Sequence, residues 1–312
     1  MTRWFREVGD ASLFPAGSVV AIGAFDGVHR GHQCLLAMAR ARAEAGAHAS
    51  VALSFEPLPR EYFAPQSPPP RLTPARTRFE LLRGLGMDGV GLLRFDPALA
   101  GMDAGDFVER ILVRGLSART VCVGPDFRFG RGRGGDVALL QRMGSTLGFE
   151  TLVAAQVDDA QGRRIGASAI RGALQRGDLD FAKEALGRRY AIAGKVMHGN
   201  RLGRTLGFPT ANIAIRWRPA VEGIFAVRVS GAGLLGHPGV ASLGTRPTVA
   251  GDGSLVLESH LFDYAGDLYG QRLIVEFVAR LRGEARFDSL DALTTQMHED
   301  ARQARAVLAR PD

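Results

Sequence analysis

The stretch VVAIGAFDGVHRGH, residues 19–32, decides how the first half of the chain is interpreted. Its start is rich in Val and Ile and predicts a buried strand, Gly27 permits a turn, and residues 31–45 have the composition of a helix. At a junction between a strand and a helix, exposed backbone N–H groups and the positive end of the helix dipole favour phosphate. The sequence therefore predicts a nucleotide-binding turn.

Two histidines, His29 and His32, lie in this predicted turn. Their ring nitrogens would add donors that stabilise charge on a phosphoryl group in a transition state. A surface turn with two incidental histidines is the alternative that an isolated HxGH pattern leaves open.

The remainder of the first half alternates between strand-like and helix-like segments, which predicts a parallel, doubly wound sheet with right-handed crossovers. The further strands are expected at residues 49–55, 90–95 and 119–124, and the further helices at 73–85, 103–113 and 136–147. The proline-rich segment 65–70 is expected to be a loop.

The second half has short strand-like segments separated by glycines, as in an antiparallel barrel. We expect strands at residues 190–197, 223–230, 237–242, 255–262 and 271–281. A terminal helix is expected from Ser289 to about Leu308, with Asp288 as its cap. The change in composition near Gly187 predicts one domain of residues 1–186 and another of residues 187–312.

Composition limits the function classes. A chain of 312 residues with 46% hydrophobic and 23% charged residues is typical of a globular protein with two domains. Cys34 and Cys122 are the only cysteines, which predicts neither a disulfide framework nor a zinc site and favours the cytoplasm. The first residues lack a signal-peptide core, and no run approaches the roughly 18 apolar residues of a membrane span.

The net charge of +7 does not by itself predict a nucleic-acid partner. The basic residues are scattered, and nearly all are arginines. Arginine-rich composition or positive clefts for phosphorylated small molecules explain the charge better, so we expect no nucleic-acid partner and no membrane partner.

The segment GKVMHGNRLGRTLGFPTAN, residues 194–212, contains four glycines whose backbone amides can wrap phosphates in a chain that has no GxxxxGK[ST] loop. Thr210 and Asn212 are two residues apart, so in an extended segment their oxygens point the same way and can share one Mg²⁺. From this spacing alone, a solvated turn is the simpler alternative.

Three segments of the first half resemble the signatures of one enzyme family. GAFDGVHRGH at 23–32 is similar to the HxGH loop of nucleotidylyltransferases, in the form found in bacterial bifunctional riboflavin kinases/FMN adenylyltransferases (FAD synthetases). VGPDFRFGRGRGGD at 123–136 resembles the VGxDFxFGxxRxGD segment of this family, and IGASAIR at 165–171 resembles ISSTxIR. Gly166 and Ala167 replace two serines of that segment, and Leu58 stands where the family usually has histidine.

The second half resembles the riboflavin kinase part of the same family. Residues 194–212 are similar to GxVxxGxxxGRxxGFPTAN, LESHL at 257–261 to the strand with the catalytic glutamate, and LRGEARF at 281–287 also follows the family. The resemblance implies a nucleotidylyltransferase domain with a Rossmann-like, doubly wound parallel sheet, followed by a β-barrel kinase domain with a terminal helix.

The resemblance also implies roles for individual residues. Catalytic roles fall to His29, His32 and Glu258, where Glu258 is the general base for the ribityl 5′-hydroxyl. The alternative for Glu258 is an ordinary exposed glutamate of an alternating strand. The implied ATP-binding residues are Gly23, Phe25, Asp26, Gly31, Asp126, Ser168, Arg171, Gly199, Gly203 and Gly207. Arg282 and Phe287 are implied in flavin binding, and Thr210 and Asn212 in binding of Mg²⁺.

These features together predict a cytoplasmic enzyme that phosphorylates riboflavin with ATP to give FMN, and then joins FMN to the AMP part of a second ATP to give FAD and pyrophosphate. Its expected partners are riboflavin, FMN, FAD and ATP, with Mg²⁺ as cofactor and no obligate protein partner. One alternative is a riboflavin kinase with a weak or inactive adenylyltransferase domain, which the change at Gly166 and Ala167 permits. Others are a flavin-binding regulatory protein or RNA-binding protein on the same domains, and a different HxGH adenylyltransferase.

Overall fold

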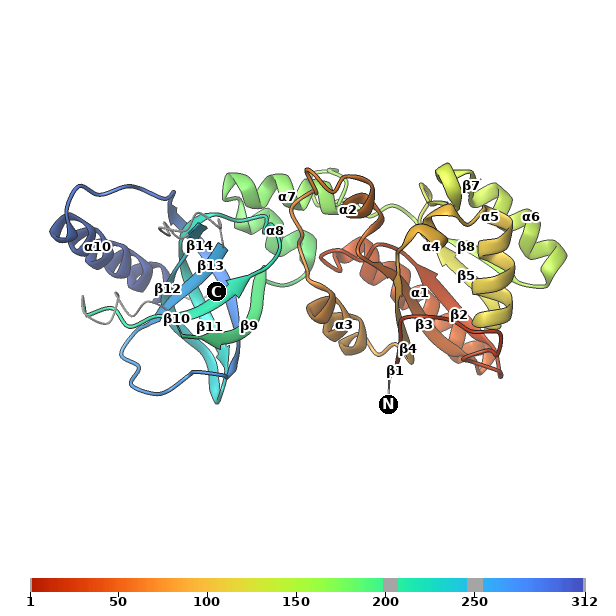
Figure 1. The fold of residues 1–312 in the computed structure, drawn as a ribbon, viewed down its shortest axis with the longest axis horizontal. Coiled ribbons are helices and arrows are strands. Elements are labelled where there is room, and N and C mark those ends of the chain that lie inside the picture. The colour runs from red at the N-terminus through yellow and green to blue at the C-terminus, as the bar shows by residue number, and fades with distance from the viewer. Residues whose placement is uncertain (1, 199–206, 246–254, 311–312) are drawn as a thin grey trace. The chain divides into compact units, whose positions relative to one another are not determined.

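The computed structural model describes residues 2–198, 207–245 and 255–310. The chain divides into two compact units (Figure 1). The first unit consists of Met1–Pro69 and Thr73–Ala167, and the second of Pro70–Leu72 and Ser168–Asp312. The short segment Pro70–Leu72, which connects the two parts of the first unit, therefore belongs to the second unit.

The first unit is built on a six-stranded sheet in which neighbouring strands are parallel, in the order β1-β4-β3-β2-β5-β8. Its strands are β1 (Arg3–Phe5), β2 (Ser18–Ile22), β3 (Ala49–Glu56), β4 (Gly89–Arg94), β5 (Ala118–Val123) and β8 (Glu150–Val153). From β2 the chain winds through β3 to β4 on one side, and from β5 to β8 on the other. The expected doubly wound parallel sheet is confirmed.

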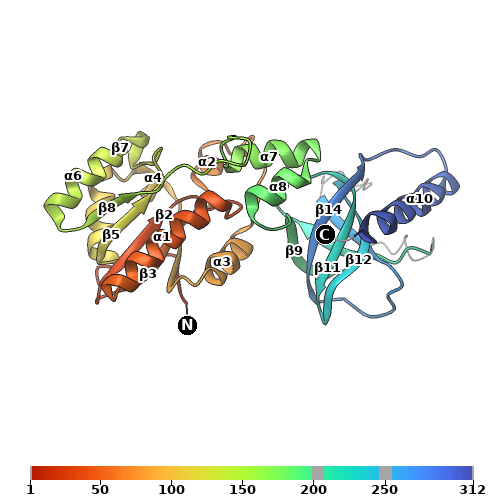
Figure 2. The same ribbon diagram turned by 180° about the vertical axis from the view of Figure 1, so that it is seen from behind.

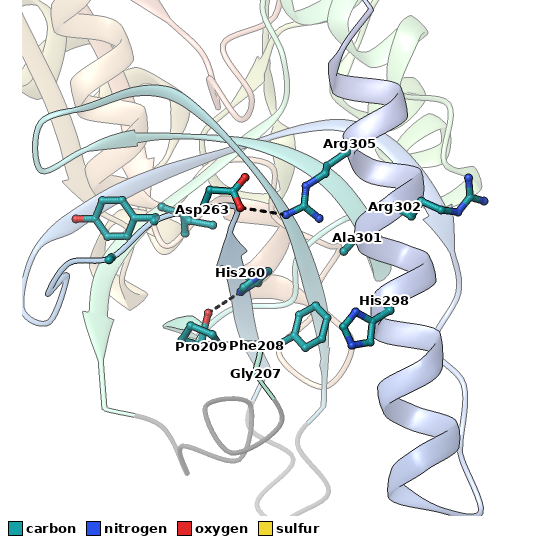
Figure 3. Close-up of a pocket in the computed structure, with 12 residues that line it drawn as sticks. Gly207, Phe208, Pro209, His260, Asp263, His298, Ala301, Arg302 and Arg305 are labelled. Atoms are coloured by element: carbon teal, nitrogen blue, oxygen red, sulfur yellow. Dashed lines mark hydrogen bonds and ion pairs between the residues drawn. The ribbon is translucent and has the colours of Figure 1, made fainter.

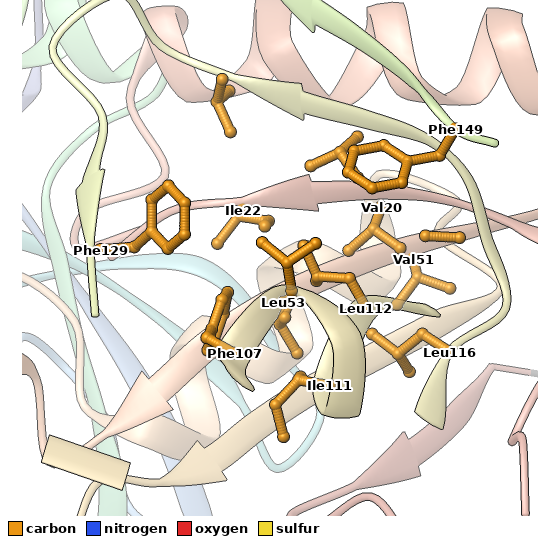
Figure 4. Close-up of a cluster of buried hydrophobic side chains, with 14 of the residues drawn as sticks. Val20, Ile22, Val51, Leu53, Phe107, Ile111, Leu112, Leu116, Phe129 and Phe149 are labelled. Atoms are coloured by element: carbon orange, nitrogen blue, oxygen red, sulfur yellow. The ribbon is translucent and has the colours of Figure 1, made fainter. Parts of the chain in front are cut away.

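The central strand β2 is buried on both faces because its sequence, SVVAI, is a nearly continuous apolar run. Val19 and Ala21 belong to the core under α1 (Arg30–Gly46) and α3 (Ala75–Gly84). Figure 2 shows α1 lying across this face of the sheet. Val20 and Ile22 belong to the opposite core, which is drawn in Figure 4. Consecutive residues of the strand therefore pack into opposite cores.

The helical segments of the first unit complete the two layers. The remaining ones are α2 (Pro59–Phe63), α4 (Pro97–Gly101), α5 (Ala104–Asp106), the π-helical segment η1 (Phe107–Gly115), the short 3₁₀ segment η2 (Arg131–Arg133) and α6 (Val137–Leu147). A small hairpin joins β6 (Arg128–Phe129) to β7 (Gly135–Asp136). The apolar side of η1 fills the second core, and α6 is capped by the Asp136 carboxylate, which accepts the N–H of Leu139.

The order of the strands determines where a ligand can bind. The chain reverses its winding direction between β2 and β5, which pair with each other. In open α/β sheets, ligands bind outside the carboxyl ends of the strands at this switch point. The segments that follow β2 and β5 are the ones singled out from sequence, namely residues 23–32 and 123–136.

The second unit contains a closed barrel with the strand order β10-β13-β12-β11-β14-β9, in which all pairs are antiparallel. Its strands are β9 (Ala191–Met197), β10 (Ala211–Ile215), β11 (Gly223–Gly231), β12 (Leu234–Thr245), β13 (Leu255–Leu261) and β14 (Arg272–Arg282). Two helices precede the barrel, α7 (Ala167–Arg176) and α8 (Leu179–Leu186), and α10 (Leu290–Leu308) follows it. The predicted antiparallel barrel with a terminal helix is confirmed.

Successive residues of the barrel strand β11 point to opposite faces of the strand. Phe225, Val227 and Val229 of β11 are fully buried in its interior, whereas Ala226 packs in the cluster that includes Ala301 and Ala304 of α10. Small residues on both sides let the helix approach the strands closely. The predicted cap of this helix was wrong by one residue: the Ser289 hydroxyl, and not Asp288, accepts the N–H of Ala292.

Candidate active sites

The turn between β2 and α1 carries the two histidines. His29 is the N-cap of α1, and its Nδ1 accepts the N–H of His32 at 3.4 Å. The two imidazole rings stack, with centroids 3.6 Å apart and an interplanar angle of 21°. The turn therefore places both predicted catalytic histidines side by side at the start of a helix, where the dipole favours an anion.

The protonation state of His32 follows from its surroundings. Burial, the neighbouring His29 and then Arg78 hold the pKa of His32 well below its ordinary value of 6.5. Its Nδ1 is buried and has no hydrogen-bond partner among the described residues. At neutral pH the ring is uncharged, so it offers one N–H donor and one acceptor instead of a cation.

Glycines and a buried phenylalanine shape the same turn. A Cβ at Gly31 would lie 3.2 Å from two atoms of the His29 ring, and a Cβ at Gly23 would lie 3.0 Å from the Phe25 ring. Phe25 itself is fully buried and meets His32 edge-on, with centroids 5.2 Å apart. The buried side chain of Phe25 thus packs against the ring of His32.

Asp26, another predicted ATP-binding residue, is 1% exposed and faces Thr73. Its Oδ1 accepts the backbone N–H of Thr73 at 2.8 Å and the Thr73 hydroxyl at 3.1 Å. The Thr73 oxygen in turn accepts the N–H of Gly27 at 2.9 Å. Asp26 is therefore part of the frame of the turn.

A buried arginine, Arg78, supports the turn and pairs with the partly exposed Glu56. Arg78 of α3 is 0% exposed and donates to the carbonyl oxygens of Ala24 and Phe55 and to the Glu56 carboxylate, the last at 2.6 Å. A buried guanidinium needs such partners because an unpaired charge would be costly. Arg78 ties the segment after β2 to the end of β3.

Aromatic side chains gather at the carboxyl ends of β3 and β4. Phe95 contacts Phe55, Tyr62 and Phe63 edge-on, at centroid distances of 5.8, 5.2 and 5.8 Å. Phe63 of α2 is 67% exposed. A large exposed ring next to a ligand-binding edge offers a stacking surface for a planar ligand.

The remaining predicted residues of this region are more exposed. Asp126, after β5, forms an ion pair with Arg164. Ser168 lies exposed at the start of α7, and the Arg171 Nε donates to the Pro70 carbonyl at 2.6 Å. Ser168 and Arg171 belong to the second unit. Their part in nucleotide binding stays a prediction.

In the barrel, the predicted kinase residues come together through strand register. Asn212 of β10 is directly opposite Glu258 of β13, so their side chains lie on the same face. The Asn212 amide nitrogen donates to the Thr210 carbonyl at 3.1 Å and to the Thr210 hydroxyl at 3.2 Å. Thr210, Asn212 and Glu258 therefore form one group of oxygen-bearing side chains.

A pocket of about 610 Å³ opens beside the Gly207–Pro209 segment that leads to this group (Figure 3). Phe208 lies between His260 and His298, with ring centroids 4.9 and 4.8 Å away. Arg305 lines the pocket from α10, forming an ion pair with Asp263 at 3.6 Å. The lining thus combines aromatic rings with cationic groups, as suits a base joined to phosphates.

Arg282, predicted to meet flavin, is held by α10. Its Nε and one Nη donate to the two carboxylate oxygens of Asp300 at 2.9 and 2.6 Å. Asp300 is 3% exposed and also accepts from the Gln296 amide. The Arg282 guanidinium lies 5.7 Å from the centroid of Phe287, the other predicted flavin contact. The structure brings these two residues together.

Some expectations are not addressed by these geometries. Gly199 and Gly203 lie outside the described residues. Among the residues that are described, no three His, Cys, Asp or Glu side chains are grouped to hold a metal ion. In the same part of the chain, no helix is long and apolar enough to cross a membrane.

Comparison with known proteins identifies the family. Residues 12–169 match the family model of FAD synthetase, and residues 186–308 match that of riboflavin kinase. The chain is 47% identical over 294 residues to the bifunctional riboflavin kinase/FMN adenylyltransferase of Pseudomonas fluorescens, covering 94% of each chain. It belongs to this family.

Two further similarities extend over the whole chain. The bifunctional riboflavin kinase/FMN adenylyltransferase of Escherichia coli K12 is 44% identical over 305 residues, which is 97% of each chain. A solved structure described as a macrolide-efflux protein from Streptococcus pneumoniae has a TM-score of 0.80 and 28% identity, and covers 97% of this chain and 98% of that one. The predicted order, FAD synthetase part first and riboflavin kinase part second, is confirmed.

Sequence reasoning missed three features of these sites. Thr73 was predicted to start a helix, but α3 begins at Ala75 and the Thr73 hydroxyl bonds to the turn of residues 26–27. The aromatic group around Phe95 has no sequence motif, because its members come from separate elements. Asp300 carries a readable signal: an acid within the apolar stripe of an amphipathic helix needs a buried partner.

Proposed function

We propose that the barrel unit transfers the γ-phosphoryl group of ATP to riboflavin, and that the parallel-sheet unit transfers AMP from a second ATP to the resulting FMN. The observation that supports the kinase assignment most directly is the register that puts Glu258 beside Asn212. The stacked histidines at the switch point of the sheet support the adenylyltransferase assignment.

In the kinase step, Glu258 accepts the proton of the ribityl 5′-hydroxyl while that oxygen attacks the γ-phosphorus and the bond to ADP breaks. Thr210 and Asn212 hold Mg²⁺, for which hydroxyl, amide and carboxylate oxygens are suitable ligands. When bound there, Mg²⁺ would supply neutralisation of phosphate charge. Arg282 and Phe287 contact the flavin, the first through a guanidinium fixed by Asp300.

The nucleotide of the kinase step binds in the pocket beside Gly207. Phe208 and its flanking histidines contact the base, and Arg305 attracts the phosphates. Gly199 and Gly203 are further proposed phosphate contacts, because they belong to the glycine-rich sequence of residues 194–212.

In the adenylyl transfer step, an oxygen of the FMN phosphate attacks the α-phosphorus of ATP, and pyrophosphate leaves. His29 and the uncharged His32 donate hydrogen bonds to the oxygens on which charge builds up. Gly23 and Gly31 keep the backbone open to the nucleotide, while Phe25 and Asp26 support the turn from inside. Asp126, Ser168 and Arg171 contact ATP in this proposal.

The FMN ring stacks on the aromatic group of Phe55, Tyr62, Phe63 and Phe95. Phe63 contributes the exposed face, and Phe95 holds it in place through an edge-on contact. An isoalloxazine ring is planar and largely apolar, which suits such a surface.

The proposal includes cytoplasmic location, small-molecule partners only, and a domain boundary near Gly187. Both cysteines, Cys34 and Cys122, are free thiols, which suits a reducing compartment.

A time course of purified protein with riboflavin, ATP and Mg²⁺ tests the two activities together. We expect FMN to appear first and then to be converted to FAD, and chelation of Mg²⁺ with EDTA to stop both steps. FMN that accumulates without FAD would support the alternative of a kinase with an inactive adenylyltransferase domain. No product of either kind would overturn the enzyme assignment.

The His32→Ala variant tests the adenylyltransferase site within the same chain. We expect FAD formation from supplied FMN to fall by about 100-fold, because a donor to the transition state is lost, while riboflavin phosphorylation stays at the wild-type rate. His48→Ala is the matched control, since His48 follows the other end of α1 and contacts the Ala16 carbonyl. Unchanged FAD formation in His32→Ala would remove the histidine from the proposal.

A further inference from the structure

The turn that presents the histidines has an unfavourable backbone. Phe25, Gly27 and Val28 have φ angles of 49°, 81° and 44°. Positive φ suits Gly27 but is strained for Phe25 and more so for the β-branched Val28. Strained backbone of this kind persists only where surrounding contacts hold it, and it clusters at functional sites. The contacts that hold this turn therefore bear on its function.

Thr73 contacts the turn from outside through three hydrogen bonds. It is 3% exposed, and its hydroxyl donates to Asp26 Oδ1 and accepts from the Gly27 N–H. Its own N–H donates to the same Asp26 oxygen. One residue thus bonds to both central positions of the turn, and both Asp26 and Thr73 are buried where these bonds are strong.

The position of the histidines depends on this turn through the chain itself. Val28 is followed directly by His29, the N-cap of α1. His32 lies in the first turn of the same helix. The Gln33 amide also donates to the Val28 carbonyl at 2.9 Å. A shift at Gly27 is therefore transmitted to the ring stack of His29 and His32.

We propose that Thr73 is a positioning residue for adenylyl transfer: its hydroxyl fixes the Asp26–Gly27 turn so that His29 and His32 are held for reaction. This inference rests on the proposed function of the two histidines. Thr73 acts through the turn and not on the substrate, so its hydroxyl contributes to the rate of the chemical step more than to the binding of FMN or ATP.

The Thr73→Val variant isolates the hydroxyl. Valine keeps the branched shape and leaves the backbone N–H bond to Asp26 in place, but it can neither accept from Gly27 nor donate from its side chain. Thr73→Ser restores the hydroxyl on a smaller side chain. Thr77→Val is the matched control, because Thr77 lies in α3 and its buried hydroxyl has no hydrogen-bond partner among the described residues.

The experiment measures kcat and KM of full-length protein for FAD formation from FMN and ATP, and separately for riboflavin phosphorylation. We expect Thr73→Val to lower kcat of FAD formation by at least about tenfold, with KM values for FMN and ATP changed by less than about twofold. Thr73→Ser and Thr77→Val should stay within about threefold of wild type. Riboflavin phosphorylation should be unchanged in all three variants.

Three outcomes would overturn the inference. They are an unchanged kcat in Thr73→Val, a Thr73→Ser variant as slow as Thr73→Val, and a parallel loss of both activities with a lowered unfolding temperature. His32→Ala in the same assay separates this inference from the proposed function. If His32→Ala is inactive in FAD formation and Thr73→Val is fully active, only the role of Thr73 fails, whereas an active His32→Ala removes the function on which it rests.

Discussion

The two candidate sites are held in place by different kinds of structure. In the parallel-sheet unit, His29 and His32 follow a turn with positive φ angles, which contacts from Thr73 and Arg78 support. In the barrel unit, Glu258 lies opposite Asn212 in a regular antiparallel ladder. The first site depends on buried side chains that support the turn, and the second on main-chain hydrogen bonds.

This difference predicts how each site responds to substitution. In a ladder, the backbone is fixed by many neighbouring bonds, so a side-chain change removes one chemical group and leaves the remainder in place. In a strained turn, a change in a buried supporting residue moves groups that are themselves unaltered. Substitutions in the barrel should therefore change the reaction rate with less change in the surrounding structure than substitutions in the turn.

The largest expected effect is that of Glu258→Gln in the barrel. Glutamine has nearly the same shape but cannot accept the proton, so riboflavin phosphorylation should fall roughly a thousandfold. FAD formation from supplied FMN should be unchanged. The matched control is Glu276→Gln, another half-buried strand glutamate of the barrel. Equal rates in Glu258→Gln and Glu276→Gln would mean that Glu258 is an ordinary strand residue.

A smaller effect is expected where the barrel meets α10. Asp300→Asn removes the charge that holds Arg282, and we expect the unfolding free energy of the unit to fall by about 2 kcal/mol. KM for riboflavin should rise about tenfold, because the Arg282 guanidinium is no longer fixed.

The control for Asp300 lies one residue earlier on the same helix. Hydrogen bonds from Arg302 and Gln303 lower the pKa of Glu299 to about 2, but this pair is exposed to solvent. Glu299→Gln should change stability and KM little, because exposed ion pairs contribute little. Similar losses in the two variants would show that the burial of Asp300 is unimportant.

The smallest effect concerns pH and the parallel-sheet unit. The folded state keeps His32 uncharged by lowering its pKa, so the unfolded chain binds protons more readily. His32 therefore has no effect on stability above the unfolded pKa of about 6.5, and lowers stability increasingly as pH falls below it. The slope is at most about 1.4 kcal/mol per pH unit.

We expect His32→Gln to lose less thermal stability than wild type between about pH 7 and pH 5.5. Unfolding temperatures measured by calorimetry across this range check the difference. Parallel curves for the two proteins would mean that the pKa of His32 is not lowered in the folded state.

Much of the fold could be predicted because patterns in the sequence are local. The strand expected at residues 49–55 agrees with β3 within one residue of its observed end, and the helix expected at 136–147 agrees with α6 within one residue of its observed start. The strands that were missed have a physical explanation. β1 has three residues and lies at a sheet edge, β6 and β7 have two residues each, and β8 is only half-buried. β10 belongs to a glycine-rich sequence that was interpreted as a phosphate-binding segment.

The candidate sites were predictable to the extent that their residues are close in sequence. Thr210 and Asn212 were expected to lie together, and they do. The partners that come from distant segments were not predictable. Thr73 bonds to Asp26 and Gly27, which lie 47 and 46 positions earlier in the chain. Arg282 bonds to Asp300, which lies 18 positions later. Such contacts depend on how the elements pack against one another, and the local sequence pattern carries no information about this packing.

The segment Pro70–Leu72, which belongs to the second unit, affects how the two activities can be separated in the laboratory. The Arg71 N–H donates to the Arg218 carbonyl at 2.8 Å, and the Pro70 carbonyl accepts from Arg171, so two of these three residues form hydrogen bonds within the second unit. A fragment that ends at Ala167 carries them away from those bonds, and a fragment that begins at Ser168 lacks them. No single cut of the gene yields both units whole, and a faithful dissection of the enzyme requires inactivating substitutions instead of truncations.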